Sequence, residues 1–202
     1  MKKLLLGFAG DMASGKGTAT ELVKLWYADT PSFRFSDTLR EFWECWRLHI
    51  AADHQIVLPE KPTTKDLQEL STALRRIFGE NMMERATVLR AEQSASRSPV
   101  VVIEGIRRLV DIRTLMEDQE LNFRLIYIEA SADVRWQRHR TRNEKPGDAD
   151  LTFEQFLALG EAEPEKEIRL LRPSAHLVLD NSRGLNLLEI ALIRAIAGWI
   201  AS

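Results

Sequence analysis

Residues Leu4–Thr18, LLLGFAGDMASGKGT, join a short apolar segment to a glycine-rich turn and the start of a helical pattern. The segment Leu4–Ala9 is continuously apolar, as expected of a strand covered on both faces. The turn fits G-x-x-x-x-G-K, and a helical pattern follows at 15–27. Glycines at both ends let several amide N–H groups point inward, and the helix N-terminus adds positive potential. A glycine turn that merely caps a helix is the alternative, but the position between strand and helix favours a phosphate-binding loop.

The rest of the chain repeats this alternation of strands and helices. Further strands are predicted at 33–36, 100–104, 123–129 and 176–179. Further helices are predicted at 37–52, 63–78, 80–95, 109–119, 132–142, 152–159, 161–171 and 185–200. Parallel neighbours need a crossover helix between them. We therefore predict an α/β fold, the three-layer P-loop NTPase fold, with a central parallel sheet of about five strands and helices on both faces. Ligands are expected at the carboxyl ends of the strands.

The length of 202 residues suits one well-buried core that carries a small insert. We expect a single domain, 1–202, with an acceptor-binding helical region at about 37–96 and a small lid at about 138–152. The lid is predicted from the segment 143–150, NEKPGDAD, because proline, glycine and charge together are typical of an exposed loop.

Charge and cysteine usage narrow the expected partners. A net charge of −2 and a pI near 6.1 give no overall attraction to duplex nucleic acid or to an acidic membrane. Cys45 is the only cysteine, so an intrachain disulfide and a multi-cysteine zinc site are excluded, and a buried position is expected. The apolar run near the N-terminus is strand-length and lacks a cleavage pattern. We therefore expect a cytoplasmic protein.

The loop itself is the predicted binding site for a nucleoside triphosphate. Its expected residues are Gly10, Asp11, Met12, Ala13, Ser14, Gly15, Lys16, Gly17 and Thr18. Lys16 gives a full positive charge to the β and γ oxygens. Gly17 stands where a serine or threonine usually ligates Mg²⁺, so the metal depends on water and carboxylates, with the hydroxyl of Thr18 next. Asp11 puts a negative charge into a loop built for anions, and we expect it to point outward or to contact a metal-bound water.

Two carboxylates are candidate Mg²⁺ ligands beside Thr18. Glu104 ends a buried strand next to the expected phosphate site, where an unpaired carboxylate would be costly. Asp37 begins a predicted helix, so a plain N-cap is the alternative to a role near metal or acceptor.

Three arginines lie on one face of the predicted helix at 132–142. Arg135, Arg138 and Arg142 are spaced i, i+3 and i+7, and like charges this close repel one another unless an anion binds. Phosphoryl transfer depends on positive charge held around the transferred group. We predict that Arg138 and Arg142 help to bind the triphosphate and that Arg138 is catalytic with Lys16. The alternative is a solvated basic face paired with the acidic residues Glu161, Glu163, Glu165 and Glu167.

Four segments, in order along roughly residues 4–181, resemble the adenylate kinases and related nucleoside monophosphate kinases. They are Gly15–Thr18 (GKGT), Ser36–Arg40 (SDTLR), Val100–Arg108 (VVVIEGIRR) and Asp133–Arg142. In that family a glycine after the lysine is usual, and the arginine of the second segment grips the acceptor phosphate. The resemblance therefore implies that role for Arg40.

The third segment departs from the family pattern. Glu104 takes the Walker B position, where the family usually has aspartate, and Arg107 with Arg108 replaces a Phe-Pro-Arg pattern. The resemblance implies that Arg107, or Arg108 beside it, contacts the acceptor. The group also includes deoxynucleoside monophosphate kinases and, more distantly, dephospho-coenzyme A kinase.

These patterns predict an ATP-dependent phosphotransferase that uses Mg²⁺ and acts on a nucleoside or deoxynucleoside monophosphate. Its partners would be ATP and that small phosphorylated acceptor. A kinase of another small acceptor such as dephospho-coenzyme A, or a nucleotide-binding regulatory ATPase, is the alternative. The sequence leaves open the acceptor base, the choice of ATP or GTP, and the oligomeric state.

Two further residue patterns have competing interpretations. The helical spacing of Phe42, Trp43 and Trp46 predicts core packing, with stacking on an acceptor base as the alternative. Arg40 could instead pair with Glu44 one turn away.

Overall fold

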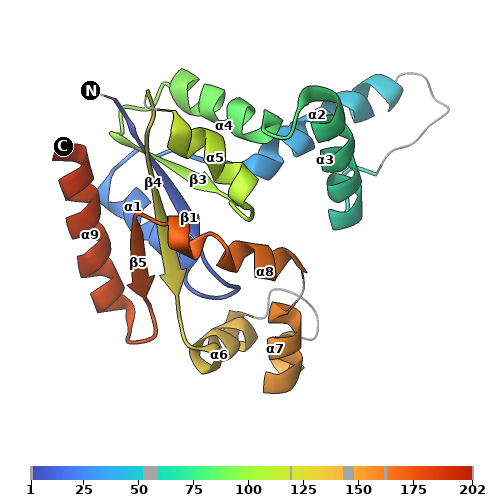
Figure 1. Ribbon diagram of the computed structural model, residues 1–202. Coiled ribbons are helices and arrows are strands. Elements are labelled where there is room, and N and C mark those ends of the chain that lie inside the picture. Colours follow the sequence, from blue (N-terminus) through green and yellow to red (C-terminus); the bar gives the residue numbers. More distant parts are fainter. Residues whose placement is uncertain (1, 52–58, 119, 143–147, 162, 202) are drawn as a thin grey trace.

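The computed structural model describes residues 2–51, 59–118, 120–142, 148–161 and 163–201, within which five parallel strands form one sheet (Figure 1). The strands are β1 Leu4–Ala9, β2 Ser32–Arg34, β3 Val100–Glu104, β4 Asn122–Glu129 and β5 Leu177–Asp180. Their order is β2-β3-β1-β4-β5, so the first strand lies at the centre and pairs with β3 and β4. This arrangement confirms the predicted α/β fold.

The helices match the predicted alternation closely. They are α1 Lys16–Trp26, α2 Phe35–Ala51, α3 Thr64–Phe78, α4 Met82–Gln93, α5 Leu109–Glu117, α6 Ala132–Arg142, α7 Phe153–Gly160, α8 Glu163–Arg169 and α9 Leu185–Ala201. Two 3₁₀ turns, Asp148–Asp150 and Arg172–Ser174, follow α6 and α8. The helix predicted at 161–171 is therefore shorter, and residues 170 and 171 form a turn that precedes the second 3₁₀ turn.

Side chains alternate across β1, and each face of the sheet has its own apolar core. On one face Leu5 and Ala9 pack with residues from α2 to α5. On the other face Leu4, Leu6 and Phe8 pack with α1 and α9. The two cores confirm the three layers, helix, sheet and helix.

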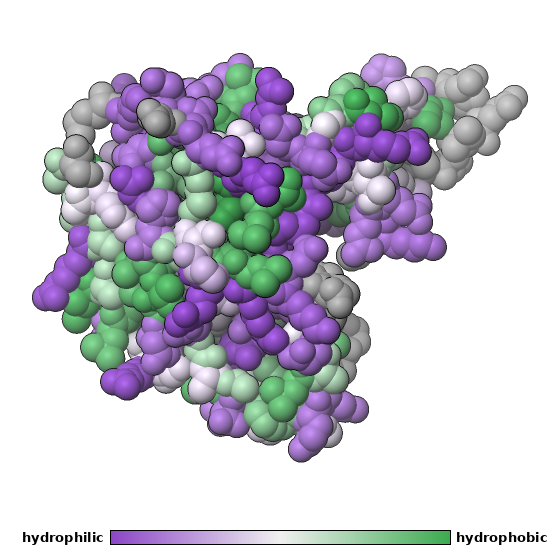
Figure 2. Space-filling view, in the orientation of Figure 1, coloured by the Kyte–Doolittle hydropathy of each residue, from purple (hydrophilic) through white to green (hydrophobic). Residues whose placement is uncertain are grey.

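Two helices form an arm that projects from the body, α2 and α3 (Figure 1). Figure 2 shows mainly hydrophilic side chains on this arm and an indentation between it and the lower part of the body. Phe42 and Trp46 are 36% and 52% exposed, and Cys45 is exposed too. The prediction that these side chains pack in the core was wrong, because only the first turns of α2, at Phe35 and Leu39, contact the sheet's core.

The first turn of α2 differs slightly from the prediction. The helix begins at Phe35 rather than Asp37, because the buried Phe35 ring joins the core. The Asp37 carboxylate accepts a hydrogen bond from the amide N–H of Arg34 at 2.8 Å. A plain N-cap was the alternative predicted for Asp37. It lies instead in the first turn of the helix and accepts the N–H of Arg34, the residue that precedes the helix.

The predicted start and end of the second helix of the arm, α3, are confirmed. Thr63 caps α3 in a capping box with Asp66, and Gly79 ends that helix with a φ of 99°.

The predicted lid is only partly described, since residues 143–147 lie outside the described residues. The segment that follows folds back onto α6. The indole N–H of Trp136 donates to the Leu151 carbonyl at 2.8 Å, and Arg140 donates to the Ala149 carbonyl at 2.7 Å. Among the described helices, none is long and apolar enough to cross a lipid bilayer.

Candidate active site

The loop between β1 and α1 has a backbone that requires glycine at two positions. Gly10 and Gly15 have φ angles of 143° and 112°, where residues with a Cβ are strained. A Cβ on Gly10 would lie 2.0 Å from the Ile128 carbonyl oxygen, and one on Gly15 would lie 2.2 Å from Nδ2 of Asn181. The first and sixth positions of the G-x-x-x-x-G-K pattern are therefore fixed by contacts with the ends of β4 and β5.

Lys16 folds back over the loop that precedes it. Its Nζ donates to the carbonyl oxygens of Gly10 at 2.6 Å and Asp11 at 2.8 Å. Burial lowers the pKa of Lys16 to about 8, the Glu165 carboxylate opposes that shift, and the charges of Arg107 and Arg142 reinforce it. Two further guanidinium groups, one after β3 and one at the end of α6, therefore lie close enough to act on the lysine.

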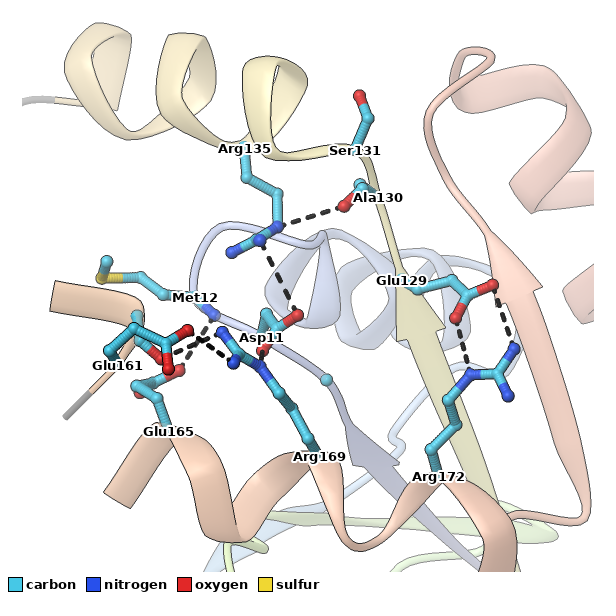
Figure 3. Close-up of polar contacts among 12 residues, drawn as sticks. Asp11, Met12, Glu129, Ala130, Ser131, Arg135, Glu161, Glu165, Arg169 and Arg172 are labelled. Carbon is cyan, nitrogen blue, oxygen red and sulfur yellow. Dashed lines mark hydrogen bonds and ion pairs between the residues drawn. The ribbon is translucent and has the colours of Figure 1, made fainter. Parts of the chain in front are cut away.

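Asp11 binds two arginines from different helices (Figure 3). One carboxylate oxygen accepts a hydrogen bond from Nε of Arg169 at 3.1 Å, and the other lies 3.8 Å from a terminal nitrogen of Arg135. Arg135 also donates to the Ala130 carbonyl at 3.1 Å. The expectation that Asp11 points outward is thus corrected, because the two guanidinium groups neutralise its charge at the loop.

Helix α8 reaches the loop through a second carboxylate. Glu165 accepts a hydrogen bond from the Met12 amide N–H at 3.2 Å (Figure 3). Arg169 on the same helix also donates to Glu161 at 2.8 Å and to the Gly160 carbonyl at 2.9 Å. Sequence reasoning treated the glutamates of this segment only as surface charge. The sequence signal that could have indicated a contact with the loop was Arg169, four residues after Glu165 on a helix that follows the predicted lid.

Arg138 contacts the loop and the residue that follows β5. Its guanidinium group donates to the Asn181 carbonyl at 2.8 Å and to the Ser14 carbonyl at 3.4 Å. The buried Asn181 side chain donates to the same Ser14 carbonyl at 2.8 Å. Asn181, which the sequence did not single out, therefore braces the loop, and the catalytic role of Arg138 stays a prediction.

The structure separates the roles of the two adjacent arginines after β3. The guanidinium group of Arg108 donates twice to one carboxylate oxygen of Asp111 in the first turn of α5, from Nε at 3.2 Å and from a terminal nitrogen at 3.1 Å. Asp111 is buried and also pairs with Arg75 at 3.4 Å. Arg107 is exposed, and its charge acts on Lys16. The geometry favours Arg107 over Arg108 for contact with a ligand.

The predicted metal ligands lie beside α1. A pocket of about 370 Å³ is lined by Gly17, Thr20, Glu21, Lys24, Ser32, Arg34, Asp37 and Glu104. Glu104 pairs with Nε of Arg34 at 2.8 Å. Gly17 lines this pocket, whereas the neighbouring Thr18 is exposed and is not among the lining residues. The assignment of Thr18 as a ligand stays a prediction.

The Mg²⁺ site at this pocket stays a prediction, and its two predicted carboxylate ligands, Glu104 and Asp37, are both among the lining residues. Among the described residues no group of three or more His, Cys, Asp or Glu side chains could hold a metal ion by itself. Mg²⁺ usually keeps several waters and takes one or two protein carboxylates together with substrate phosphates. Glu104 and Asp37 supply that number.

Arg40, predicted to grip the acceptor, is exposed on α2. Glu44 instead binds Arg47 at 2.6 and 2.7 Å.

Known proteins of similar sequence or structure were found for this chain. No family model matches the chain. A UPF0200 protein of Staphylothermus marinus is 28% identical over 157 residues, which is 78% of this chain and 72% of that protein. The TT1252 protein of Thermus thermophilus has a TM-score of 0.58 at 21% identity, covering 98% of both chains. Shikimate kinase of Bacteroides thetaiotaomicron has a TM-score of 0.56 at 12% identity, covering 96% of this chain and 97% of that chain.

The chain therefore shares the α/β fold of these solved structures, a five-stranded parallel sheet with helices around it. A sugar kinase of Janibacter sp. HTCC2649 shares it at a TM-score of 0.50 and 16% identity, over all of this chain and 95% of that one. At these identities the likeness establishes the fold alone. The finer resemblance to nucleoside monophosphate kinases stays a prediction.

Proposed function

We propose that the protein transfers the γ-phosphoryl group of ATP to a nucleoside or deoxynucleoside monophosphate. The observation that carries this proposal is the glycine-bounded loop between β1 and α1, with the Nζ of Lys16 held over it by the carbonyls of Gly10 and Asp11. Lys16 lies in the loop, and Arg107 and Arg142 come close enough to lower its pKa. Such a concentration of positive charge is what a triphosphate and its transferring group require.

Each group in the site has a role in this reaction. Lys16 and the loop amides bind the β- and γ-phosphates. Glu104 and Asp37, with Thr18 as a further predicted ligand, would hold Mg²⁺, which neutralises developing charge on the phosphates when it is bound. Arg107 and Arg40 orient the acceptor, and Arg138 and Arg142 bind the triphosphate of the donor. Closure of the lid excludes water, which would otherwise hydrolyse the donor.

The proposed position of the acceptor is a second pocket next to the one that Gly17 lines. This pocket, of about 480 Å³, is lined by Phe33, Asp37, Glu41, Arg90, Gln93 and Ser94. It shares Asp37 with the pocket next to Gly17. Most of its residues come from the predicted acceptor region at 37–96. The Phe33 ring and the Gln93 amide are suited to a base, whereas Arg90 is paired with Glu41 of the same pocket, and neither Arg40 nor Arg107 is among the lining residues.

One observation favours a second candidate, a kinase of a hydroxyl acceptor such as dephospho-coenzyme A. A hydroxyl nucleophile must lose a proton during transfer, whereas a phosphate monoester oxygen is already ionised at neutral pH. Asp37 lines both pockets and provides a carboxylate that could take this proton.

The test is an ADP-release assay with Mg·ATP and a panel of ribo- and deoxyribonucleoside monophosphates plus dephospho-coenzyme A. The proposal predicts acceptor-dependent ADP release with at least one monophosphate and a nucleoside diphosphate product. Release only with dephospho-coenzyme A would establish the second candidate. Slow hydrolysis that is indifferent to every acceptor would instead indicate a regulatory ATPase.

A further inference from the structure

A buried carboxylate, that of Asp111, holds the turn that carries Arg107. The turn, residues 105–108, joins β3 to α5. One carboxylate oxygen of Asp111 accepts the amide N–H of Arg107 at 3.1 Å and that of Arg108 at 2.9 Å. A capping box at the start of a helix needs only the second of these hydrogen bonds, so the first one fixes the backbone at Arg107 itself.

The other oxygen of the Asp111 carboxylate is bound by two guanidinium groups. Nε and a terminal nitrogen of Arg108 donate to it at 3.2 and 3.1 Å, and a terminal nitrogen of Arg75, in α3 of the arm, donates at 3.4 Å. The side chains of Asp111 and Arg75 are only 4% and 10% exposed. Removing one partner of a buried ion pair is costly, because it leaves an uncompensated charge. The carboxylate is therefore held in place both from the body and from the arm.

The side chain of Arg107 has no such support of its own. In the described part of the chain its guanidinium group forms no hydrogen bond or ion pair, and the residue is exposed. A long side chain without partners keeps much of its rotamer freedom, so the direction in which it leaves the chain depends on the backbone that carries it. That backbone is fixed by the buried side chain of Ile106 and by the hydrogen bond from the Arg107 amide to Asp111.

We propose that Asp111 is a positioning residue for Arg107, because it fixes the turn 105–108 so that the guanidinium group of Arg107 lies on the side of Lys16. The inference rests on the proposed function and deepens it, since the phosphate of the acceptor must reach the phosphoryl group that Lys16 binds. Arg108 is then a partner of Asp111 rather than of a ligand. Without the carboxylate, Arg107 would take more directions, and part of the binding energy of the acceptor would be used to order it.

The test is a double-mutant cycle in the ADP-release assay, with saturating Mg·ATP and with the acceptor varied. The acceptor is the ribo- or deoxyribonucleoside monophosphate that wild type phosphorylates fastest. Arg107→Ala is expected to lower kcat/KM about ten- to a hundredfold and Asp111→Asn about three- to tenfold, with the larger part in the KM of the acceptor. In the double variant, Asp111→Asn should add less than about twofold, because the side chain that it positions is gone. Glu117→Gln removes an exposed charge from the last turn of α5 and should match wild type.

A role of Asp111 in folding alone would give a different pattern. Losses that multiply in the double variant, or wild-type kcat/KM in Asp111→Asn, overturn the positioning role while the proposed function stands. An equal loss in Glu117→Gln overturns it too, because general charge would then be the cause.

Thermal melting verifies that each chain is folded at the assay temperature. If Asp111→Asn is not, Asp111→Glu replaces it in the cycle with the same expectations, because it keeps the charge for Arg75 and Arg108 but shifts the oxygen that the two amides share. Absence of acceptor-dependent ADP release by wild type, with every monophosphate, overturns the proposed function itself.

Discussion

Gly15 offers the sharpest test of the loop geometry, through the substitution Gly15→Ala. The backbone there has a φ of 112°, and an added Cβ would lie 2.2 Å from Nδ2 of Asn181. That nitrogen donates the buried 2.8 Å hydrogen bond to the Ser14 carbonyl. The methyl group must therefore push Asn181 off its partner or distort the loop.

The expected cost has two parts. Holding a residue with a Cβ at a positive φ costs about 1–2 kcal/mol. Leaving the buried Asn181–Ser14 bond unmade costs about 1–3 kcal/mol more. The free energy of unfolding should fall by about 2–5 kcal/mol, and the melting temperature by roughly 4–20 °C for a chain of this size.

Gly17→Ala is the matched control, because a Cβ at Gly17 meets nothing within 4 Å and the residue lies in the first turn of α1. Alanine there should change the free energy of unfolding by zero to about +1 kcal/mol, since it favours helix. Urea unfolding and thermal melting of both variants provide the measurement. If Gly15→Ala proves as stable as Gly17→Ala, the loop does not have the described backbone.

Three further outcomes are expected. Arg138→Ala should lower turnover at least about a hundredfold, as other phosphoryl-transfer arginines do, while thermal melting shows a folded chain; wild-type turnover would remove its assignment. Affinity for Mg·ATP should be constant at pH 6.5–7 and fall above pH 8, because the pKa of Lys16 is lowered to about 8 and the neutral amine binds phosphate poorly. Calorimetric titration of Mg·ATP at several pH values checks this, and an affinity that rose above pH 8 would contradict the account. Burial raises the pKa of Glu84 to about 7, so the folded state holds that proton more tightly than the unfolded state and stability falls as pH rises from about 4.5 to about 7. Urea unfolding should show that Glu84→Gln removes this part of the pH dependence, and an unchanged profile would refute it.

The sequence was most informative where structure is decided locally. The strand, loop and helix of residues 4–26 were predicted because the buried run, the two glycines and the lysine all lie within a short stretch. The cap at Thr63 and the stop at Gly79 were found for the same reason.

Features that depend on distant contacts were not predictable. Nothing near Asp11 indicates that Arg169 and Arg135 neutralise it, since both come from helices far along the chain. The apolar spacing of Trp46 is the same whether a helix is covered or projects from the body, and here it is exposed. Asn181 braces Ser14 only because β5 ends beside the loop.

The most direct measurement of the central claim is calorimetric titration of Mg·ATP into the wild-type protein and into Lys16→Ala. Lys16 is held at the loop by the Gly10 and Asp11 carbonyls, so its removal deletes charge from the site without touching the apolar cores. One molecule of ATP per chain is expected to bind wild type, with binding weakened at least about tenfold in the variant. No heat of binding to wild type at millimolar ATP, or equal affinity in both proteins, would contradict the account.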